Sequence, residues 1–417
     1  MDTPQIVHPD ERLNPTARAL LEFLRSSDGS SAVASVQDLP PQAWEETIAL
    51  ALRHGVGPLL QRALRKCDRL AKLSEYLQLR LEEDRRATAL DNLRNYAEFR
   101  RIARALQKRG IPVIALKGLH LAELVYRDIS LRRMGDLDIL VPLAQVEHAV
   151  AALQTLDYSS NGLPPSLHDV ALTHGRMGIL VEVHWTLAEP TETYVPPIEE
   201  IWRLAVPVKL GDADALVMSP ELLLLHVCVH LAYHHFFAFD LRALCDIVEI
   251  VRAYPALDWA AVVDLGRRHH CGRGIAVALS LARDHLGAAV PADALEAIGG
   301  DALDPDLLGD ALEQLATYVE ISNELRFAPN LMAFTGASGA REKVAALWKR
   351  ILVPRTELGQ IYGVSEHSAR INFYYAVRLR DLVRSYAASA RELIVSGPQL
   401  TATAARNERL SKWMAGA

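Results

Sequence analysis

The sequence predicts a mainly helical α+β protein, in which a small mixed-sheet core is flanked by N-terminal and C-terminal helical regions. Apolar residues recur at helical spacing over most of the 417 residues. Runs rich in branched residues, which favour strands, gather between residues 111 and 217. Half of the residues are hydrophobic and 23% are charged, a balance that is typical of a globular chain and not of a disordered one.

These patterns divide the chain into five regions, and a chain of this length is expected to hold about two to three domains. We expect an N-terminal helical region over residues 1–108, an α/β core over 109–217, a helical domain over 218–330, basic helices over 331–396 and a flexible tail over 397–417.

The N-terminal region should consist of amphipathic helices, because residues 14–108 carry apolar stripes at three- and four-residue spacing. The last helix is predicted over residues 91–106, and Gly110 is its stop signal. Its buried side is expected to consist of Leu93, Phe99, Ile102 and Leu106.

Strands and helices alternate in the next part of the chain. Strands are predicted over residues 111–116, 136–141 and 178–185, with a further extended piece around 206–217. Short helices are predicted over residues 119–126 and 142–156. This order of strand, helix, strand, helix and strand indicates a small α/β core.

From Ser219 onwards the signals are helical again. Ser219 suits an N-cap, with Pro220 at the first helical position. Helices are predicted over residues 221–233, 241–253, 259–270, 275–286, 312–325, 341–352 and 367–394.

Carboxylates on two of the predicted strands are the strongest chemical signal. Residues two apart on a strand point to the same face, so Asp136 and Asp138 should project side by side. Two carboxylates this close repel each other unless a cation lies between them, and such ligands suit Mg²⁺ together with substrate phosphates. By the same alternation Glu182 shares a face with His184, and it becomes a third carboxylate if the two strands are neighbours.

Solvated acids are the alternative interpretation of Asp136 and Asp138, because such pairs are common on half-exposed strands. The surrounding residues favour a metal site. They comprise a glycine turn upstream, Arg132 and Arg133 directly before the pair, and a second strand with an acid between apolar residues.

A set of short motifs extends through this part of the chain. It comprises Leu116-Lys117-Gly118, Tyr126, Arg132-Arg133, Asp136-x-Asp138-Ile-Leu-Val, Val181-Glu182-Val183-His184-Trp185, Ser219-Pro220 and Leu241-Arg242-x-x-x-Asp246. The set resembles a bacterial family of uncharacterised nucleotidyltransferases, which belongs to the DNA polymerase β-like nucleotidyltransferase superfamily. The resemblance covers roughly residues 95–290.

The resemblance implies roles for individual residues. Asp136 and Asp138 would coordinate the metal ions that bridge the phosphates of an NTP. Glu182 would ligate the second metal and help to deprotonate the attacking hydroxyl. The residues implied to bind the nucleotide are Lys117, Gly118, Arg132 and Arg133. The residues expected in a substrate cleft are Tyr126, His184, His230 and His234.

The sequence departs from the superfamily pattern near the expected phosphate site. The usual Gly-Gly or Gly-Ser step is Gly118-Leu119 here, so a side-chain hydroxyl for the phosphate is missing. The interval from Gly118 to Asp136 is also longer than the commonest superfamily spacing. The three carboxylates are all present.

The implied reaction is in-line displacement at the α-phosphate of an NTP, most simply ATP, with Mg²⁺ or Mn²⁺ as the metal and pyrophosphate as the leaving group. The acceptor would be a hydroxyl- or phosphate-bearing group on a small molecule, a peptide or protein, or an RNA end. Two alternatives stay open. One is a protein that binds NTP or a partner on the same fold without turnover, and the other is a phosphotransfer enzyme that acts on a peptide or small molecule.

Three histidines recur on one face of the helix after Ser219. His226, His230 and His234 are four residues apart, and with Cys228 nearby a zinc site is conceivable. No fourth ligand with suitable spacing is evident. A stripe that lines a cleft or caps buried carbonyls is therefore the favoured alternative.

Charge is unevenly distributed along the chain. The net charge is −6, yet residues 341–417 are net positive. Aromatic and basic residues over 373–384 suit a nucleic-acid surface, but a packed aromatic side with a solvated basic side is favoured. The sequence has no signal segment and no apolar run of about 18 residues, so we expect a cytoplasmic protein with no membrane partner.

Overall fold

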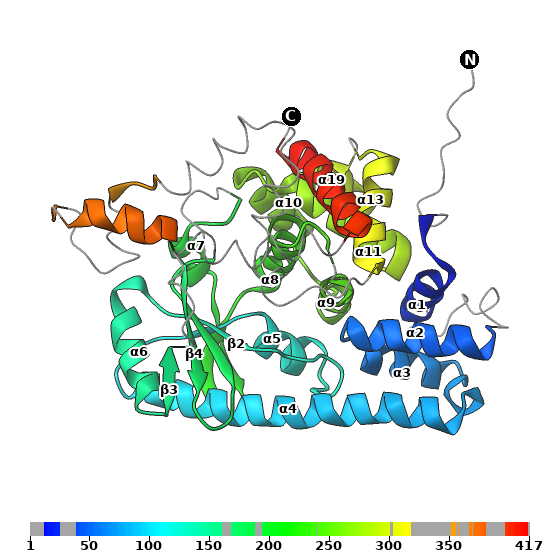
Figure 1. Ribbon diagram of the computed structural model, residues 1–417, viewed down its shortest axis with the longest axis horizontal. Coiled ribbons are helices and arrows are strands. Elements are labelled where there is room, and N and C mark those ends of the chain that lie inside the picture. The colour runs from blue at the N-terminus through cyan, green and yellow to red at the C-terminus, as the bar shows by residue number, and fades with distance from the viewer. Residues whose placement is uncertain are drawn as a thin grey trace, which may run out of the picture.

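The computed structural model confirms a mainly helical α+β architecture, in which helices precede and follow a seven-stranded mixed sheet (Figure 1). None of the described helices is both long and apolar enough to cross a lipid bilayer. The structure describes residues 12–25, 39–160, 168–187, 194–238, 240–300, 303–317, 352–355, 358, 367–368, 370–380 and 397–415.

The N-terminal region is helical, and its last helix is very long. The elements are α1 (Pro15–Arg25), α2 (Pro41–Arg53), α3 (Gly57–Lys66), a 3-10 turn at Leu70–Lys72, and α4 (Glu75–Gln107). Ser74 begins α4 as an N-cap, because its hydroxyl accepts a hydrogen bond from the Leu77 backbone N–H (3.4 Å). Helix α4 runs along one edge of the molecule, past both the other N-terminal helices and the sheet (Figure 1).

The inward face of α4 differs from the predicted one at a single position. Phe99 and Ile102 are buried as predicted, but Leu93 is 56% exposed. The adjacent Asn92 takes the inward position, where its amide donates hydrogen bonds to two backbone carbonyls of residues 129–132 (2.6 and 2.7 Å). The need to pair these buried carbonyls decides which side of the helix faces the core.

The sheet has the strand order β3-β4-β5-β2-β1-β7-β6. Its strands are β1 (Ile114–Ala115), β2 (Leu137–Leu140), β3 (Tyr158–Ser160), β4 (Asp169–His174), β5 (Leu180–His184), β6 (Val206–Leu210) and β7 (Ala213–Val217). The β2–β5 and β1–β7 pairs are parallel, and the other neighbours are antiparallel. The three predicted strands correspond to β1, β2 and β5, the extended piece is the β6–β7 hairpin, and β3 and β4 were not predicted.

Short helical elements connect the strands and cover the sheet. They are α5 (Lys117–His120), the π-helical η4 (Leu121–Val125), η5 (Leu143–Gln145), α6 (Val146–Gln154) and α7 (Ile198–Arg203). One hydrophobic core joins α4 and α6 to the sheet, and it includes Phe99, Leu153, Leu137, Ile139 and Val183. This packing buries one face of the central strands and fixes which side chains remain on the other face.

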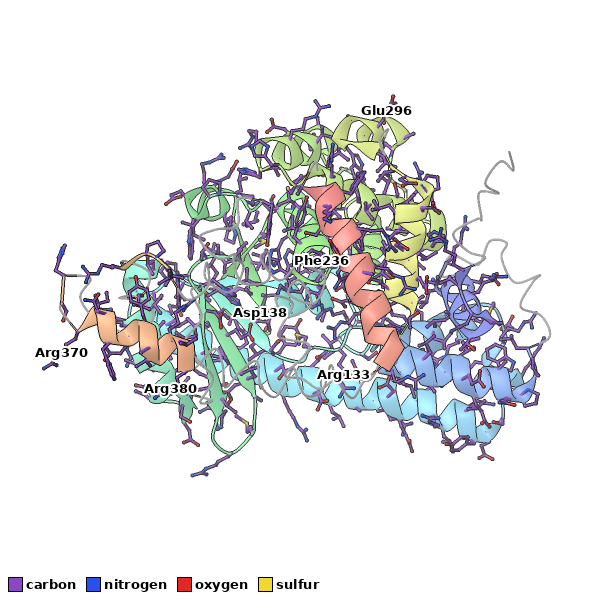
Figure 2. All side chains as sticks on the ribbon, turned by 45° about the horizontal axis from the view of Figure 1, so that its top comes forward. Arg133, Asp138, Phe236, Glu296, Arg370 and Arg380 are labelled. Carbon is purple, nitrogen blue, oxygen red and sulfur yellow. The ribbon has the colours of Figure 1, made fainter. Side chains whose placement is uncertain are left out.

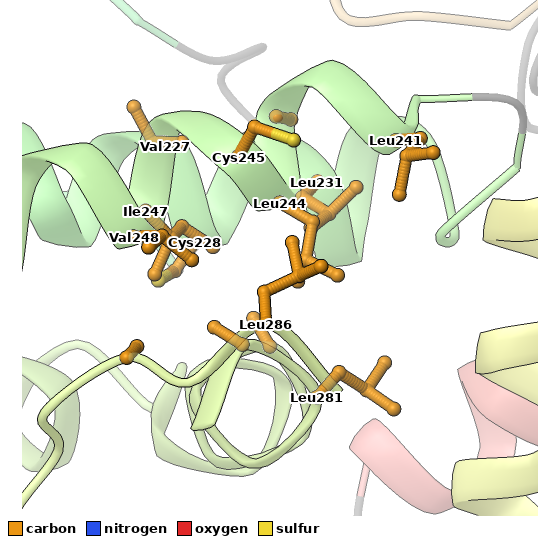
Figure 3. Close-up of a cluster of buried hydrophobic side chains, with 14 of the residues drawn as sticks. Val227, Cys228, Leu231, Leu241, Leu244, Cys245, Ile247, Val248, Leu281 and Leu286 are labelled. Atoms are coloured by element: carbon orange, nitrogen blue, oxygen red, sulfur yellow. The ribbon is translucent and has the colours of Figure 1, made fainter. Parts of the chain in front are cut away.

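The second hydrophobic core joins the N-terminal helices to the helices that follow the sheet. These are α8 (Pro220–Val229), the π-helical η6 (His230–His234), α9 (Leu241–Ala253), α10 (Trp259–Arg268), α11 (Gly272–Leu286), α12 (Ala292–Ile298) and α13 (Pro305–Ala316). Figure 3 shows α8, α9 and α11 packed through side chains such as Val227, Cys228, Leu244 and Leu281.

The C-terminal end differs from the predicted flexible tail. Helix α19 (Gly397–Met414) packs against α13, because Leu410 and Met414 are buried and Arg409 pairs with Asp310 (2.6 Å). The predicted helix over 341–352 lies outside the described residues except for its last residue. Of the predicted helix over 367–394, residues 371–380 are described and are helical.

Candidate active site

Three carboxylates meet where β2 and β5 lie side by side. Asp138 and Glu182 are directly paired across this parallel ladder. Asp136 immediately precedes β2 and lies on the same side as Asp138, whereas Leu137 and Ile139 belong to the core on the other side. The fold therefore brings together the three acids that the sequence predicted as metal ligands.

Neighbouring charges shift the pKa values of Asp136 and Asp138 in opposite directions. The negative charge of Asp138, together with burial and Glu182, raises the pKa of Asp136 to about 6. Burial also opposes the charge of Asp138, but Lys117 and His184 outweigh it and hold the pKa of this carboxyl well below its usual range. Asp138 therefore keeps its negative charge, and Asp136 binds a proton more readily than an isolated aspartate.

Two cationic side chains contact the carboxylates. Lys117 Nζ lies 3.6 Å from Asp138 Oδ2, and His184 Nε2 lies 3.4 Å from both Asp138 Oδ1 and Glu182 Oε2. Burial opposes a charge on His184, but its hydrogen bonds to the two carboxylates outweigh burial and raise its pKa to about 9. Protonated His184 therefore donates to the acids and holds them in position.

The donor set suits a hard divalent cation. Carboxylate oxygens of Asp138 and Glu182 lie within 4.8 Å of each other, and Asp136 adjoins them. Carboxylate oxygens are the ligands that Mg²⁺ and Mn²⁺ prefer. The raised pKa of Asp136 indicates that Lys117 and His184 do not neutralise the whole group, so the three carboxylates could hold a metal ion.

Lys117 and Gly118 are the first two residues of α5, which begins directly after β1 and Leu116. Lys117 has a φ of +29°, which is uncommon for a residue with a side chain. A Cβ atom on Gly118 would lie 2.9 Å from Met134 Cγ and 3.1 Å from Arg132 Nη1. The glycine thus allows close packing against the segment before β2, at the place where the resemblance implied an approach of the triphosphate.

Arg132 and Tyr126 both meet Asp246 of α9. Arg132 donates through Nη2 to Asp246 Oδ2 (2.9 Å) and through Nε to Oδ1 (3.3 Å), and the Tyr126 hydroxyl donates to Oδ1 (2.8 Å). The side chains of Arg132 and Asp246 are only 9% and 3% exposed. The guanidinium of Arg132, which was predicted to bind phosphate, is therefore bound to Asp246. This buried ion pair connects the segment before Asp136 to α9.

Arg133 is exposed, and Arg242 lies beside it. The carbonyl of Arg133 accepts hydrogen bonds from Nη1 of Arg132 (3.2 Å) and from Nη1 of Arg242 (3.2 Å). The positive charge of Arg242 partly offsets the rise in the pKa of Asp136. The buried Nε of Arg242 has no hydrogen-bond partner among the described residues. Arg242 was not predicted as a site residue, although its motif spacing to Asp246 was a signal for it.

The sequence matches a protein family over the part of the chain that builds this site. Residues 40–287 match the model of a family described as an uncharacterised nucleotidyltransferase. The chain belongs to this family. None of the curated proteins matches it. The match begins just before α2 and ends just after α11, so the carboxylates, the start of α5 at Lys117 and the Asp246 contacts all lie within the nucleotidyltransferase region.

The histidine stripe of this nucleotidyltransferase lies near the carboxylates. His226, His230 and His234 line a small, mostly apolar pocket with residues of α8 and of the segments around 187, 196 and 218. Burial lowers the pKa of His234 to about 3, and the charge of Lys117 adds to this effect. Burial and Lys117 lower the pKa of His226 and His230 in the same direction, so the stripe presents neutral imidazoles.

The conceivable zinc set of this stripe with Cys228 does not form in the described part of the chain. Cys228 is fully buried in the hydrophobic core shown in Figure 3, and no metal-type cluster of described residues includes it. His230 instead lies beside His235, whose Nε2 is 3.3 Å from its own.

The described part of the basic C-terminal region lies to one side of the nucleotidyltransferase site. Figure 2 shows Arg370 and Arg380 at one side of the molecule, displaced from Asp138 near its centre. Phe373 is 69% exposed, so the aromatic residues of this helix do not all form a packed side. Helix α19 directs Arg406 and Arg409 to acidic residues of α13.

Proposed function

We propose that the chain transfers a nucleotidyl group, most simply AMP from ATP, to a hydroxyl- or phosphate-bearing acceptor in a reaction that needs Mg²⁺ or Mn²⁺. The observation that carries this proposal is the in-register pairing of Asp138 with Glu182, with Asp136 one pleat away. This arrangement gathers three carboxylates on one face of two neighbouring strands. The family to which the chain belongs supports the reaction class, and the carboxylates support the metal dependence.

The chemistry requires one bond to form and one to break at the α-phosphorus. An oxygen of the acceptor bonds to this phosphorus, the bond to the bridging oxygen breaks, and pyrophosphate leaves with the electron pair. Asp136, Asp138 and Glu182 would hold the metal ions, whose charge stabilises the phosphate oxygens and lowers the pKa of the attacking hydroxyl. Glu182 lies beside Asp138 at the less buried edge of the group, and we assign it to take up the proton of the acceptor.

Cationic side chains around the carboxylates are assigned to the triphosphate. Lys117 lies next to Asp138, and Arg242 lies close enough to Asp136 to affect its pKa. The exposed Arg133 adjoins Arg242. Arg132 is held by Asp246, so we assign to it the positioning of the segment that carries Asp136.

The substrate cleft is proposed to lie between the carboxylates and the histidine stripe. His184 contacts the acids directly, and His230 and His234 line the adjacent apolar pocket. Neutral imidazoles and apolar side chains suit an uncharged part of a substrate, such as a nucleobase or the body of the acceptor. Tyr126 contributes indirectly, because its hydroxyl is hydrogen-bonded to Asp246.

The position of a phosphate label separates the candidate reactions. The chain is incubated with Mn²⁺, ATP labelled at either the α- or the γ-phosphate, and mixtures of small alcohols, peptides and short RNAs. We expect transfer of the α label with release of pyrophosphate. Transfer of the γ label would instead identify a phosphotransfer enzyme, and tight ATP binding without any transfer would identify a binding protein.

Removal of the paired aspartates tests the assignment of the site. The double variant Asp136→Asn with Asp138→Asn should lower transfer by about 100-fold or more, because it removes two of three metal ligands. The matched control is Asp214→Asn, which changes an exposed aspartate on β7 that pairs with Lys209. Pyrophosphate release at the wild-type rate by the folded double variant would contradict the assignment.

A further inference from the structure

We propose a second metal site, which binds a transition-metal ion such as Zn²⁺ through His230, His235 and Asp240. The Nε2 atoms of the two histidines are 3.3 Å apart, and a carboxylate oxygen of Asp240 lies within 4.8 Å of both. In a tetrahedral zinc site with Zn–N bonds of about 2.0–2.1 Å, two ligand nitrogens lie about 3.3–3.4 Å apart. The two imidazoles therefore already have the separation that a shared metal ion requires.

The backbone explains why these residues meet. His230 begins a π-helical turn, and the His235 N–H donates to the His230 carbonyl (3.1 Å), so residues five apart fall on one face. Phe236 and Phe237 then adopt left-handed conformations, with φ of 48° and 60°, and return the chain towards Asp240. Strained residues with side chains in this conformation occur preferentially at functional sites.

The strained turn is held by the rest of the molecule. Phe237 is fully buried, and the side chain of Gln314 in α13 donates a hydrogen bond to the Phe236 carbonyl (2.6 Å). Phe236 lies near the centre of the molecule in Figure 2. The position of His235 is therefore fixed by packing before any ligand binds.

The two carboxylate oxygens of Asp240 have different roles in the proposed site. Its Oδ1 accepts a hydrogen bond from the Ala243 N–H (3.2 Å) and caps α9, and among the described residues no hydrogen bond to Oδ2 is formed, so this oxygen can coordinate a metal ion. Two imidazoles and one carboxylate leave a fourth position for water or a substrate atom. The set shares no residue with Asp136, Asp138 and Glu182, so it does not rest on the proposed reaction.

Metal content tests this site. After chelation and dialysis against Zn²⁺, the full chain should retain about one equivalent of zinc, and Co²⁺ in its place should give the visible absorption of a tetrahedral site. His235→Ala and Asp240→Ser should both lose the metal. Serine at position 240 can still cap α9, so this variant keeps the test valid if the histidine variant does not fold.

Two controls distinguish this site from the carboxylate site. The variant Asp136→Asn with Asp138→Asn should keep its zinc, and so should His148→Ala, which removes an exposed histidine. The proposal is overturned if the wild-type chain binds no more zinc than His235→Ala. It is also overturned if the zinc disappears only when the aspartates are changed.

A separate observation concerns the exposed face of α4, and from it we infer that this face pairs with the same face of a second copy of the chain. Most surface hydrophobic residues occur singly. Here four of the ten large hydrophobic residues exposed in the described structure lie on one helix. They are Tyr76 (60% exposed), Leu79 (53%), Leu90 (55%) and Leu93 (56%).

The stripe is continuous and has the spacing of a helix–helix seam. Between its two apolar pairs stand Glu83 and Arg86, which are also exposed, so the spacing alternates between three and four residues throughout. Such a stripe packs against another helix through alternating positions of a heptad. From Tyr76 to Leu93 it extends for about 26 Å along the helix.

The order of residues along this seam is self-complementary. If two copies of α4 run antiparallel about a two-fold axis between residues 84 and 85, every member of the seam meets a suitable partner. The pairs, each formed twice, are Tyr76 with Leu93, Leu79 with Leu90, Glu83 with Arg86, and Glu75 with Arg94. A two-fold interface needs this kind of self-complementary surface, and an unrelated partner would not need it.

Molecular mass in solution tests the pairing. Light scattering and sedimentation of the full chain should show a dimer at about 100 μM, and Leu90→Glu with Leu93→Glu should give a monomer. Both leucines are exposed, so the fold should tolerate the change. Leu143→Glu alters a leucine that is 64% exposed elsewhere, and it should leave the dimer intact.

A charge exchange tests the antiparallel alignment. Arg86→Glu places like charges opposite each other near the axis and should raise the dimer Kd by about tenfold. Adding Glu83→Arg in the same chain should restore the Kd, because an arginine at position 83 of one copy then faces a glutamate at position 86 of the other. A monomeric wild-type chain, or a dimer that survives the leucine changes, would overturn the proposal, and failure of the charge exchange to restore the Kd would overturn the alignment.

Discussion

At the scale of single residues, position decides how identical side chains behave. Asp136 and Asp138 are two residues apart, yet their pKa values move in opposite directions. Asp138 has Lys117 and His184 as partners, whereas Asp136 faces mainly negative charge. The alternation of the strand predicted that both acids share a face, but the contacts of Lys117 and His184 depend on tertiary structure.

This difference predicts that metal binding by the carboxylates strengthens as the pH rises to about 6. The pKa of Asp136 is raised from 3.8 to about 6, and its proton must leave before a metal ion binds. The affinity for Mn²⁺, measured by calorimetry, should fall about tenfold per pH unit below this value and level off above it. In the metal-free chain the raised pKa contributes stability at low pH, and this contribution is lost as the pH rises through about 6.

The matched variant removes the titrating group. Asp136→Asn should bind Mn²⁺ more weakly, and its affinity should lose most of the dependence on pH in this range. A wild-type affinity that stays constant between about pH 5 and pH 7 would show that Asp136 is not a ligand.

At the scale of elements, local patterns predicted the strands that carry the acids. Alternation of acid and apolar residues marks β2 and β5, because one side of each strand is in the core. Strands β3 and β4 lack this signal: β3 has only three residues, and β4 has the polar residues Asp169 and His174 at buried positions and Val170 at a half-buried one. Their pairing to β5 and to each other decides their conformation, and no short stretch of sequence contains that information.

The contacts of α9 with the segment before β2 could not be predicted for the same reason. Arg132 and Asp246 are far apart in the sequence, and only the fold makes them neighbours. Both residues belong to the sequence motifs, but the resemblance implied that Arg132 binds a phosphate of the nucleotide. A buried carboxylate on a neighbouring helix satisfies the same guanidinium.

We predict that Asp246→Ala lowers the free energy of unfolding by about 3–5 kcal/mol, because it leaves the buried charge of Arg132 without a partner. Urea denaturation measures this loss. The control Asp264→Ala removes an exposed partner of Arg268 and should cost about 1 kcal/mol or less. A loss of similar size in both variants would show that the buried pair has no special role.

A second variant separates stability from positioning. Arg132→Met with Asp246→Leu replaces the ion pair by apolar side chains and should recover most of the stability. Nucleotidyl transfer should stay impaired, because the segment before Asp136 loses its directional contact with α9. Full recovery of transfer would limit the role of the pair to stability.

At the scale of the whole molecule, both ends of the described chain meet on α13. Arg12 Nη1 lies 3.4 Å from Asp310 Oδ1, and Arg409 Nη2 lies 2.6 Å from Asp310 Oδ2. Arg406 of α19 also pairs with Glu313. Part of the positive charge near the C-terminus therefore serves an internal contact.

Asp310→Asn should loosen both ends together. Its side chain is only 9% exposed, and loss of its charge weakens hydrogen bonds to two arginines at a cost of about 1–3 kcal/mol. Hydrogen exchange should increase in α1 and α19 and stay unchanged in β2 and β5. The control is Asp284→Asn on α11, whose exposed carboxylate pairs with the adjacent Arg283. Unchanged exchange in α1 or α19 would contradict a shared anchor.

Because Asp138 and Glu182 are paired only in the native register of β2 and β5, enzymatic activity depends on the correct alignment of these two strands. A shift of β5 by one residue would turn Glu182 to the opposite face, and a shift by two would move it about 7 Å along β2. Val181 and Val183 could exchange places in the second case, so burial alone would not reject it. Refolded chains with this error would be compact and helical but inactive. Circular dichroism would not distinguish them from native chains, whereas the specific activity would report the fraction of molecules in the native register.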